Sequence, residues 1–499
     1  MSVVRAARAV AATIFSAVLF VICTSCGETY RPVAFPIPPT APSPGAANTV
    51  FVLSANGPND PGAMSRIDVS GDSYLNANNL GVAPVHAALL PSGNILYAAN
   101  NANDTISASS VSSSGNTATT ISLPAGSLPV FVHTTENSRV YAANYGFGTV
   151  SAINTATNVV NTTISVNPSL PNNPATPDTT LPKPVALAET PDGKKLYVAN
   201  FGVDYLTSIN TVDFTRNPAI VIGGTPVAVA ARSDSKAVFA LDSNFGNVYA
   251  LDPTIIPEPL SLPVPTGAGA DFMLYDGKLN RLYVLKSGYV NAASNSSGNA
   301  LWVFDAASSI TNTSSNPPTI TPPTLLAGPI SISAAAGSPC GTGAPVPVSM
   351  TALADGSRIY VASYQINGST ICSQVDVFNT SSYVSTKTIP TGSSTIDNTN
   401  PTGCAAARPS PPGQNGPAGF RLSITGAADL PSSRIYLANC DAGAVTVITT
   451  VAIPALGSQP AQSADTVVST LAAPESVFKA VGGAPLPPPQ NPMFIFGMQ

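Results

Sequence analysis

The segment PDGKKLYVAN, residues 191–200, decides the fold of this chain. A Pro-Asp-Gly turn is followed by two lysines, an aromatic residue between aliphatic residues, and a final asparagine. A turn of this kind ahead of a short apolar run is typical of the second strand of a β-hairpin. The pattern returns along the chain in eight copies. Their aromatic positions are Phe51, Tyr97, Tyr141, Tyr197, Phe239, Tyr283, Tyr360 and Tyr436.

The spacing of these copies predicts the architecture. Successive aromatic positions lie 46, 44, 56, 42, 44, 77 and 76 residues apart, and repeats of about 40 to 50 residues have the size of a propeller blade. Around Tyr197, short strands are predicted over 185–188, 195–199, 206–210 and 219–222. We therefore predict an all-β protein, a β-propeller of eight four-stranded antiparallel blades, in which the two long steps are blades with insertions.

The repeat also has a family resemblance. The Tyr-Val-Ala-Asn of 197–200, the Tyr-Val-Ala-Ser of 360–363 and the Pro-Asp-Gly turn resemble the YVTN β-propeller repeat, and the resemblance covers residues 48–482. That family more often closes with seven blades, so a seven-bladed ring is the alternative. The resemblance implies an architecture and no single reaction, because such propellers include lactonases, quinoprotein dehydrogenase subunits, surface-layer components and binding scaffolds.

The way the ring closes can be predicted from its two ends. The first copy, 49–54, has no inner strand before it, and a propeller must avoid leaving sheet edges open. A strand from the C-terminus would remove both edges. We expect residues 476–481, which follow a fourth-strand-like stretch at 466–471, to supply it. Residues 483–499 are then predicted to form a Pro-rich C-terminal tail.

Composition excludes several classes of protein. Only 9% of the residues are charged, and the net charge is −5, against about 25% charged residues in an ordinary soluble domain. No basic footprint for nucleic acid is present. The 44% of hydrophobic residues argues against general disorder. The 49 prolines and 38 glycines favour strands and turns over long helices.

The first 25 residues are predicted to be a signal peptide. Arg5 and Arg8 precede an apolar run over 10–22, which is too short for a stable membrane span; an uncleaved anchor helix is the alternative. The small residues before Cys26 resemble the lipobox of bacterial lipoproteins, which implies that Cys26 is lipidated. The Pro-rich residues 26–47 would be an extended tether. We expect a lipid-anchored protein of the bacterial cell envelope, at the outer membrane.

Signal removal and lipidation leave four cysteines, an even number suited to disulfides in an oxidising compartment. Cys340 lies in the connection entering the seventh blade, and Cys372 lies in the loop after its second strand. Cys404 and Cys440 occupy nearly the same places in the eighth blade. Because these loops emerge on one face of a blade, each pair can approach to disulfide distance. We predict Cys340 with Cys372 and Cys404 with Cys440; four free thiols or a metal site are the alternatives.

Residue types suited to catalysis are scarce. The chain has two histidines and no phosphate loop, nucleophile elbow or zinc-protease motif, so no catalytic residue, metal or cofactor is predicted. His86 and His133 fall at small-residue positions of adjacent inner strands, where they could bind a ligand, act as a base or line a watery funnel. Glu189 and Arg232, at the ends of inner strands, are further candidates at the channel mouth, or else solvated turn residues.

A second candidate surface consists of aromatic residues that follow the second strands and should gather on one face. They are Tyr145, Phe147, Phe201, Tyr205, Phe245 and Tyr289. Aromatic side chains there suit the recognition of a sugar or peptide by stacking. The alternative is that they pack the seams between blades.

Three functions follow from these features. The default is a non-enzymatic binding or scaffold module for a protein, peptide or glycan of the envelope. The first alternative is a periplasmic lactonase-like hydrolase or lyase with a site in the central channel. The second alternative is a structural component of a surface layer.

Overall fold

The computed structural model describes nine stretches of the chain. They are residues 49–111, 118–171, 182–287, 299–399, 403–404, 421–426, 434–455, 461–472 and 491–497. All of them belong to the unit Ala41–Gln499, which is distinct from Met1–Thr40. The predicted signal peptide, Cys26 and the tether lie outside the described residues.

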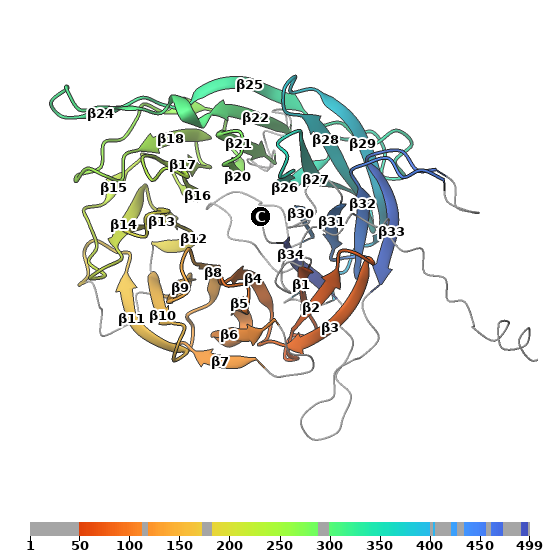
Figure 1. The fold of residues 1–499 in the computed structure, drawn as a ribbon, viewed down its shortest axis with the longest axis horizontal. Coiled ribbons are helices and arrows are strands. Elements are labelled where there is room, and N and C mark those ends of the chain that lie inside the picture. The colour runs from red at the N-terminus through yellow and green to blue at the C-terminus, as the bar shows by residue number, and fades with distance from the viewer. Residues whose placement is uncertain are drawn as a thin grey trace, which may run out of the picture. The chain divides into compact units, whose positions relative to one another are not determined.

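Eight four-stranded antiparallel sheets follow one another around a central axis, which confirms the all-β propeller with eight blades (Figure 1). In blades 2 to 8 the strands pair in chain order, from the inner strand near the axis to the outer strand. The helices in the described stretches are two 3₁₀ turns, η1 (Asn101–Asn103) and η2 (Ala306–Ser308). Neither is long or apolar enough to cross a membrane.

The first four blades contain the following strands. Blade 1 holds β34 (Asn491–Gly497), β1 (Thr49–Ala55), β2 (Ala63–Asp68) and β3 (Ser73–Asn79); blade 2 holds β4 (Pro84–Leu89), β5 (Ile95–Asn100), β6 (Thr105–Ser110) and β7 (Thr119–Ser122); blade 3 holds β8 (Pro129–His133), β9 (Arg139–Asn144), β10 (Thr149–Asn154) and β11 (Val159–Ser165); blade 4 holds β12 (Lys183–Glu189), β13 (Lys195–Phe201), β14 (Tyr205–Asn210) and β15 (Ile220–Val221).

The remaining blades contain these strands. Blade 5 holds β16 (Pro226–Ala231), β17 (Val238–Asp242), β18 (Asn247–Leu251) and β19 (Val264–Pro265); blade 6 holds β20 (Ala270–Asp276), β21 (Arg281–Lys286), β22 (Ala300–Asp305) and β25 (Thr324–Ser331); blade 7 holds β26 (Val346–Ala352), β27 (Arg358–Asn367), β28 (Thr370–Asn379) and β29 (Ser385–Thr395); blade 8 holds β30 (Leu422–Gly426), β31 (Arg434–Asn439), β32 (Ala444–Thr449) and β33 (Thr466–Ala472). A small hairpin of β23 (Thr311–Asn312) and β24 (Thr319–Ile320) is inserted in blade 6.

A C-terminal strand closes the ring, but it is not the predicted one. β34 pairs antiparallel with β1 and is the inner strand of blade 1. The prediction of 476–481 is therefore wrong, and the propeller reaches into the segment 483–499 that was expected to be a tail. Met493 and Ile495 are buried while Phe494 and Phe496 are partly exposed. This alternation of buried and partly exposed side chains is typical of a β-strand. A proline-dense stretch precedes the strand.

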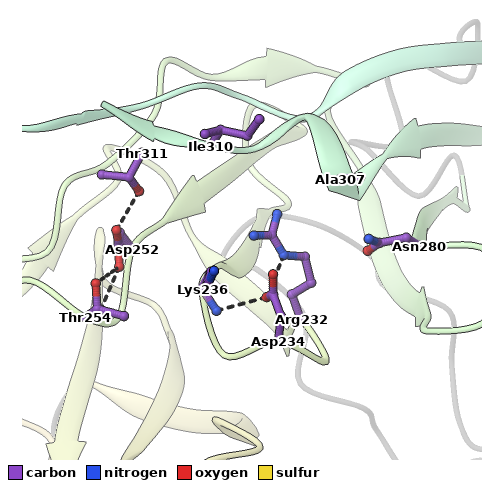
Figure 2. A pocket seen from close by; sticks show the side chains of 9 residues that line it. All are labelled: Arg232, Asp234, Lys236, Asp252, Thr254, Asn280, Ala307, Ile310 and Thr311. Carbon is purple, nitrogen blue, oxygen red and sulfur yellow. Dashed lines mark hydrogen bonds and ion pairs between the residues drawn. The ribbon is translucent and has the colours of Figure 1, made fainter. Parts of the chain in front are cut away.

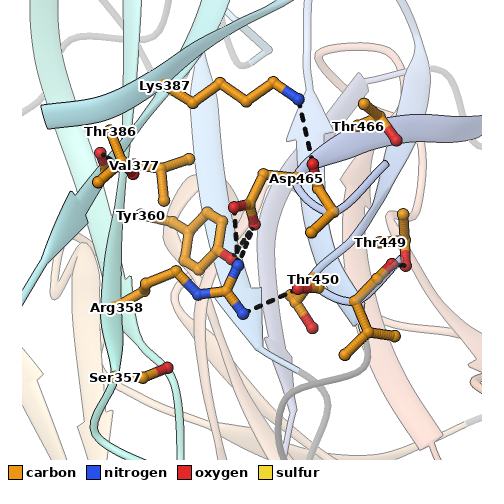
Figure 3. Close-up of polar contacts among 12 residues, drawn as sticks. Ser357, Arg358, Tyr360, Val377, Thr386, Lys387, Thr449, Thr450, Asp465 and Thr466 are labelled. Carbon is orange, nitrogen blue, oxygen red and sulfur yellow. Dashed lines mark hydrogen bonds and ion pairs between the residues drawn. The ribbon is translucent and has the colours of Figure 1, made fainter. Parts of the chain in front are cut away.

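In blades 4, 7 and 8 the basic residue and the tyrosine of the repeat join the blade to the next one. In blade 7, Arg358 Nη1 donates to both carboxylate oxygens of Asp465, at 2.6 and 2.7 Å (Figure 3). The Tyr360 hydroxyl donates to the same carboxylate at 2.5 Å. Asp465 directly precedes β33 of blade 8. We name this arrangement a seam lock: a cation and a tyrosine two residues apart, bound to one carboxylate of the outer turn of the next blade.

Two further seams carry the same lock. In blade 4, the carboxylate oxygen Oε1 of Glu258 from blade 5 accepts from Lys195 Nζ at 3.0 Å and from the Tyr197 hydroxyl at 3.4 Å. Arg434 and Tyr436 of blade 8 bind Asp72 of blade 1, at 3.1 and 2.7 Å. The motif read from the sequence therefore encodes contacts between blades as well as the strand itself.

The asparagine that ends the repeat has a role within its own blade. The amide of Asn100 donates to the hydroxyls of Thr105 and Ser107 at 3.0 and 2.9 Å, and Asn144 makes the corresponding bonds in blade 3. Both amides are buried. Because a buried amide needs partners, the third strand supplies hydroxyl groups opposite this position.

Both predicted disulfides are confirmed. Cys340 and Cys372 are bonded with their Cα atoms 6.0 Å apart, and Cys404 and Cys440 with theirs 5.5 Å apart. They join the connections entering blades 7 and 8 to the third strand β28, which contains Cys372, and to the turn after β31, which contains Cys440. Cys372 thus lies in a strand and not in the predicted loop, because β27 and β28 form a hairpin that extends beyond this position. Neighbouring repeats therefore carry similar cross-links.

Candidate functional site

The two histidines lie on the inner strands of neighbouring blades, as the sequence indicated. His86 is in the middle of β4, and His133 ends β8. Both side chains are partly exposed, whereas most of the second and third strands of these blades are buried. The inner strands of blades 2 and 3 thus each carry one partly exposed imidazole.

Backbone hydrogen bonds fix the protonation pattern of both rings. The N–H of Val132 donates to Nδ1 of His86 at 3.4 Å, and the N–H of Glu189 donates to Nε2 of His133 at 3.1 Å. A ring nitrogen that accepts a hydrogen bond carries no proton, so in the neutral ring the other nitrogen does. His86 therefore presents Nε2–H, and His133 presents Nδ1–H. The imidazoles tie blade 2 to blade 3 and blade 3 to blade 4 while each keeps one donor.

Aromatic rings from two other inner strands pack on His86. Its ring centroid lies 3.8 Å from that of Phe131 on β8 and 4.6 Å from that of Phe494 on β34. All three side chains are partly exposed. Neither phenylalanine is among the predicted site residues: Phe131 lies two residues before His133, and Phe494 falls in the predicted tail.

Both histidines are neutral at ordinary pH. Burial, together with the nearby His133, lowers the pKa of His86 to about 3. Burial lowers the pKa of His133 to about 4. A neutral ring whose free lone pair already accepts a backbone N–H is poorly placed to act as a general base. It is well placed to donate an N–H to a carbonyl oxygen or an oxyanion.

The lowered pKa values predict a stability that falls in acid. In the unfolded chain both histidines have a pKa near 6.5. Below pH 6.5 the unfolded state therefore binds protons that the folded state does not bind. The free energy of unfolding consequently decreases as the pH falls towards 4. Each histidine contributes about 2 kcal/mol to this loss between pH 7 and pH 5, so we expect the double variant His86→Gln, His133→Gln to lose about 4 kcal/mol less than the wild type over that range. Urea unfolding at both pH values measures this difference.

Comparing the wild type with the double variant separates the contribution of the histidines to the pH dependence of stability from that of the carboxylates. Burial raises the pKa of Glu189, whose N–H contacts His133, and this carboxyl therefore acts on stability in the opposite direction. Glu189 is present in both proteins. If the free energy of unfolding depended on pH equally in the two proteins, the assignment of lowered histidine pKa values would be wrong.

Glu189 and Arg232 take part in contacts away from the imidazole pair. The buried carboxylate of Glu189 accepts hydrogen bonds from Thr135 and Tyr141, so only its backbone reaches His133. Arg232 is buried, pairs with Asp234 at 2.8 Å and donates from Nη1 to two carbonyl oxygens that follow β22. Neither side chain is a solvated turn residue.

The predicted loop aromatics do not all lie in loops, because Phe201 ends the second strand β13 and Tyr205 begins the third strand β14. The Lys183 ammonium lies 5.7 Å from the ring centre of Tyr145. Phe201 is buried, and Phe245 is 56% exposed. Phe147 and Tyr205 are partly exposed, and Tyr289 lies outside the described residues. Within the described stretches, no two of these rings form an aromatic pair.

The described residues contain no group of three or more His, Cys, Asp or Glu side chains arranged to hold a metal ion. The imidazole pair lies instead with the partly exposed rings of Phe131 and Phe494.

Comparisons with known proteins place this geometry in context. The family model described as Lactonase, 7-bladed beta-propeller matches residues 49–218. The match covers strands of blades 1 to 4 and includes both histidines. This part of the chain is thus similar to the lactonase propellers, although the ring here has eight blades. No curated protein matches the chain.

Solved structures show more distant similarity. A candidate 6-phosphogluconolactonase from Bacteroides fragilis is 17% identical, with a TM-score of 0.47, over 72% of this chain and 100% of that one. Its counterpart from Bacteroides uniformis is 16% identical, with a TM-score of 0.46, over 70% and 100%. Hydrazine synthase from Kuenenia stuttgartiensis is 15% identical, with a TM-score of 0.45, over 74% and 96%. Values this low assign no function.

Proposed function

We propose that this protein is a lactonase-like hydrolase that opens a lactone ring beside the inner strands of blades 2 and 3. One observation carries the proposal: two neutral imidazoles, each with one N–H left to donate, lie within the segment that matches the lactonase family. Phe131 and Phe494 add an apolar wall next to His86. An ester ring with one polar edge suits such surroundings.

In the proposed reaction the histidines act as donors. The oxygen of a water molecule bonds to the carbonyl carbon, and the ring C–O bond breaks. The proton lost by the water ends on the alkoxide oxygen, so the product is a hydroxy acid. Negative charge develops on the carbonyl oxygen during the addition, and preorganised N–H groups stabilise it. His86 Nε2–H and His133 Nδ1–H are the groups that we assign to this task, in place of the base role considered from sequence.

Turnover of a panel of five- and six-membered lactones tests the proposal. We expect wild-type hydrolysis, and a fall in kcat of about 100-fold for His86→Gln or His133→Gln, the usual cost of losing an oxyanion donor. Glutamine can still accept the backbone N–H, which limits damage to the fold. Asp213→Asn, on an exposed outer turn, is the matched control and should keep full activity.

The same assay decides between this function and the binding module predicted from sequence. If the wild type turns over no lactone, with or without divalent metal ions, the hydrolase proposal is wrong. The exposed Phe245 and the partly exposed Tyr145 and Tyr205 then favour a binding face for a peptide or glycan. Self-assembly of the delipidated protein, followed by light scattering, would favour the surface-layer role instead.

We also propose that the protein is exported and anchored by a lipid on Cys26, as the lipobox-like sequence implies. The intact chain should partition into the detergent phase, and Cys26→Ser should move it to the aqueous phase, because the acyl chains supply the membrane affinity. Phase separation followed by blotting measures this. An unmodified mature N-terminus in mass spectrometry would contradict the anchor.

A further inference from the structure

An apolar surface extends away from the imidazole of His86 along the closing strand. Besides Phe131 and Phe494, Phe496 is partly exposed, and its ring centroid lies 6.0 Å from that of Phe494. Because Phe494 and Phe496 are two residues apart on β34, their side chains lie on the same face of the strand. We name Phe131, Phe494 and Phe496 the aromatic strip.

Aliphatic side chains of neighbouring inner strands continue the aromatic strip in both directions. Leu89, at the end of β4, is partly exposed and packs with both rings of β34 against one hydrophobic cluster. Val185 of β12 and Val229 of β16 are partly exposed and pack with Phe131 against another. Partly exposed hydrocarbon groups are therefore found on the inner strands of blades 1 to 5. Large exposed apolar patches commonly mark binding sites.

The inner strands beside His86 carry few charges. Among the described residues of β34, β4, β8, β12 and β16, the charged side chains are Lys183 and Glu189. Lys183 donates to the carbonyl oxygen of Gly146 at 3.3 Å, and Glu189 is buried and accepts from two hydroxyl groups. A phosphate group beside the aromatic strip would lose hydration without gaining a cation from these strands.

A cavity at another place in the ring is polar. It has a volume of about 500 Å³ and lies in the seam between blades 5 and 6 (Figure 2). There Arg232 pairs with Asp234, and Asp252 accepts from Thr254 and Thr311. A hydrocarbon group is therefore suited to the aromatic strip and not to this cavity.

We propose that the substrate of the imidazole site is an uncharged lactone with a hydrocarbon substituent. The substituent lies against the aromatic strip, while the lactone carbonyl accepts a hydrogen bond from His86 Nε2–H. The inference rests on the proposed function and names its substrate class. Full burial of one methylene group changes an affinity by about fourfold. Phosphorylated sugar lactones, which are charged and rich in hydroxyl groups, are expected to be poor substrates.

Hydrolysis of a series of six-membered lactones tests the inference. δ-Valerolactone has no substituent, δ-octalactone has a propyl group, and δ-decalactone has a pentyl group; gluconolactone is the polar lactone of the same ring size. We expect kcat/KM to rise at least about tenfold from δ-valerolactone to δ-decalactone, and to be at least about tenfold lower for gluconolactone than for δ-decalactone. The matching γ-lactones give the same comparison on a five-membered ring.

Two variants locate the substituent. Phe496→Ala should lower the ratio of kcat/KM for δ-decalactone to that for δ-valerolactone by at least about fivefold, because part of the apolar surface is removed. Phe272→Ala is the matched control, since Phe272 is a partly exposed phenylalanine on the inner strand of blade 6. It should change the ratio less than about twofold. The ratio does not depend on the amount of folded protein, so it is informative even for a destabilised variant.

The possible failures can be told apart. Equal kcat/KM values along the series, or a preference for gluconolactone, would overturn this inference and leave the hydrolase proposal intact. Equal effects of Phe496→Ala and Phe272→Ala on the ratio would show that the substituent does not lie on the aromatic strip. If no lactone of either ring size is hydrolysed, the proposed function itself is wrong.

Discussion

A chain that ends at Gln490 should fail to hold its ring closed. Without β34, blade 1 loses its inner strand, and the hydrogen-bonding edge of β1 is open. The truncation also removes the buried Met493 and Ile495 and the partly buried Phe494 and Phe496. Burial of each such side chain contributes about 1.5–3 kcal/mol, so the loss should exceed about 5 kcal/mol, which is comparable to the whole stability of many domains.

Thermal unfolding and size-exclusion chromatography measure this effect. We expect the truncated chain to unfold at a much lower temperature and to form oligomers through the open edge. A chain that lacks only residues 498 and 499 is the control and should behave like the wild type. If the two chains unfolded at the same temperature, the closing role of β34 would be wrong.

Removal of Asp465 should produce the second large effect, because this residue completes the seam lock of blades 7 and 8. Its carboxylate accepts two hydrogen bonds from Arg358 and one from Tyr360, and all three side chains are largely buried (Figure 3). Asp465→Ala leaves a guanidinium and a hydroxyl without their acceptor. Breaking a buried pair in this way costs about 3–5 kcal/mol.

A second ion pair of the ring supplies the comparison. Arg281 Nη1 lies 2.9 Å from Asp305 Oδ1, but both side chains are nearly one third exposed. Asp305→Asn keeps the cap on η2 and should cost less than about 1 kcal/mol. Urea unfolding gives both values. If Asp465→Ala and Asp305→Asn lost similar amounts of unfolding free energy, burial would not explain how much the seam lock stabilises the protein.

The repeat made the fold predictable to a large extent. The strands around Tyr197 were placed within two residues at their starts and ends, and the blade count came from eight aromatic positions. The disulfides followed because Cys340 and Cys404 occupy matching places in neighbouring repeats. The closing strand was misplaced, since it follows a proline-dense stretch and has no copy of the motif to mark it.

The candidate site was only partly predictable. The sequence brought His86 and His133 together, because both stand in the same phase of adjacent inner strands. It could not reveal that backbone N–H groups of Val132 and Glu189 occupy one nitrogen of each ring. Nor could it place Phe494 beside His86, since 408 residues separate them in the chain.

By itself, the sequence determined the period, the type of strand, the number of blades and the pairing of the cysteines. These depend on residues within one repeat or at matching places in two repeats. The tertiary structure alone decided which residues meet across the seams: Tyr436 binds Asp72 on the first blade, and Arg232 donates to the carbonyl oxygens of Ala306 and Ser309 on blade 6. The physical reason is that ring closure joins the two ends of the chain, and local patterns carry no record of such distant neighbours.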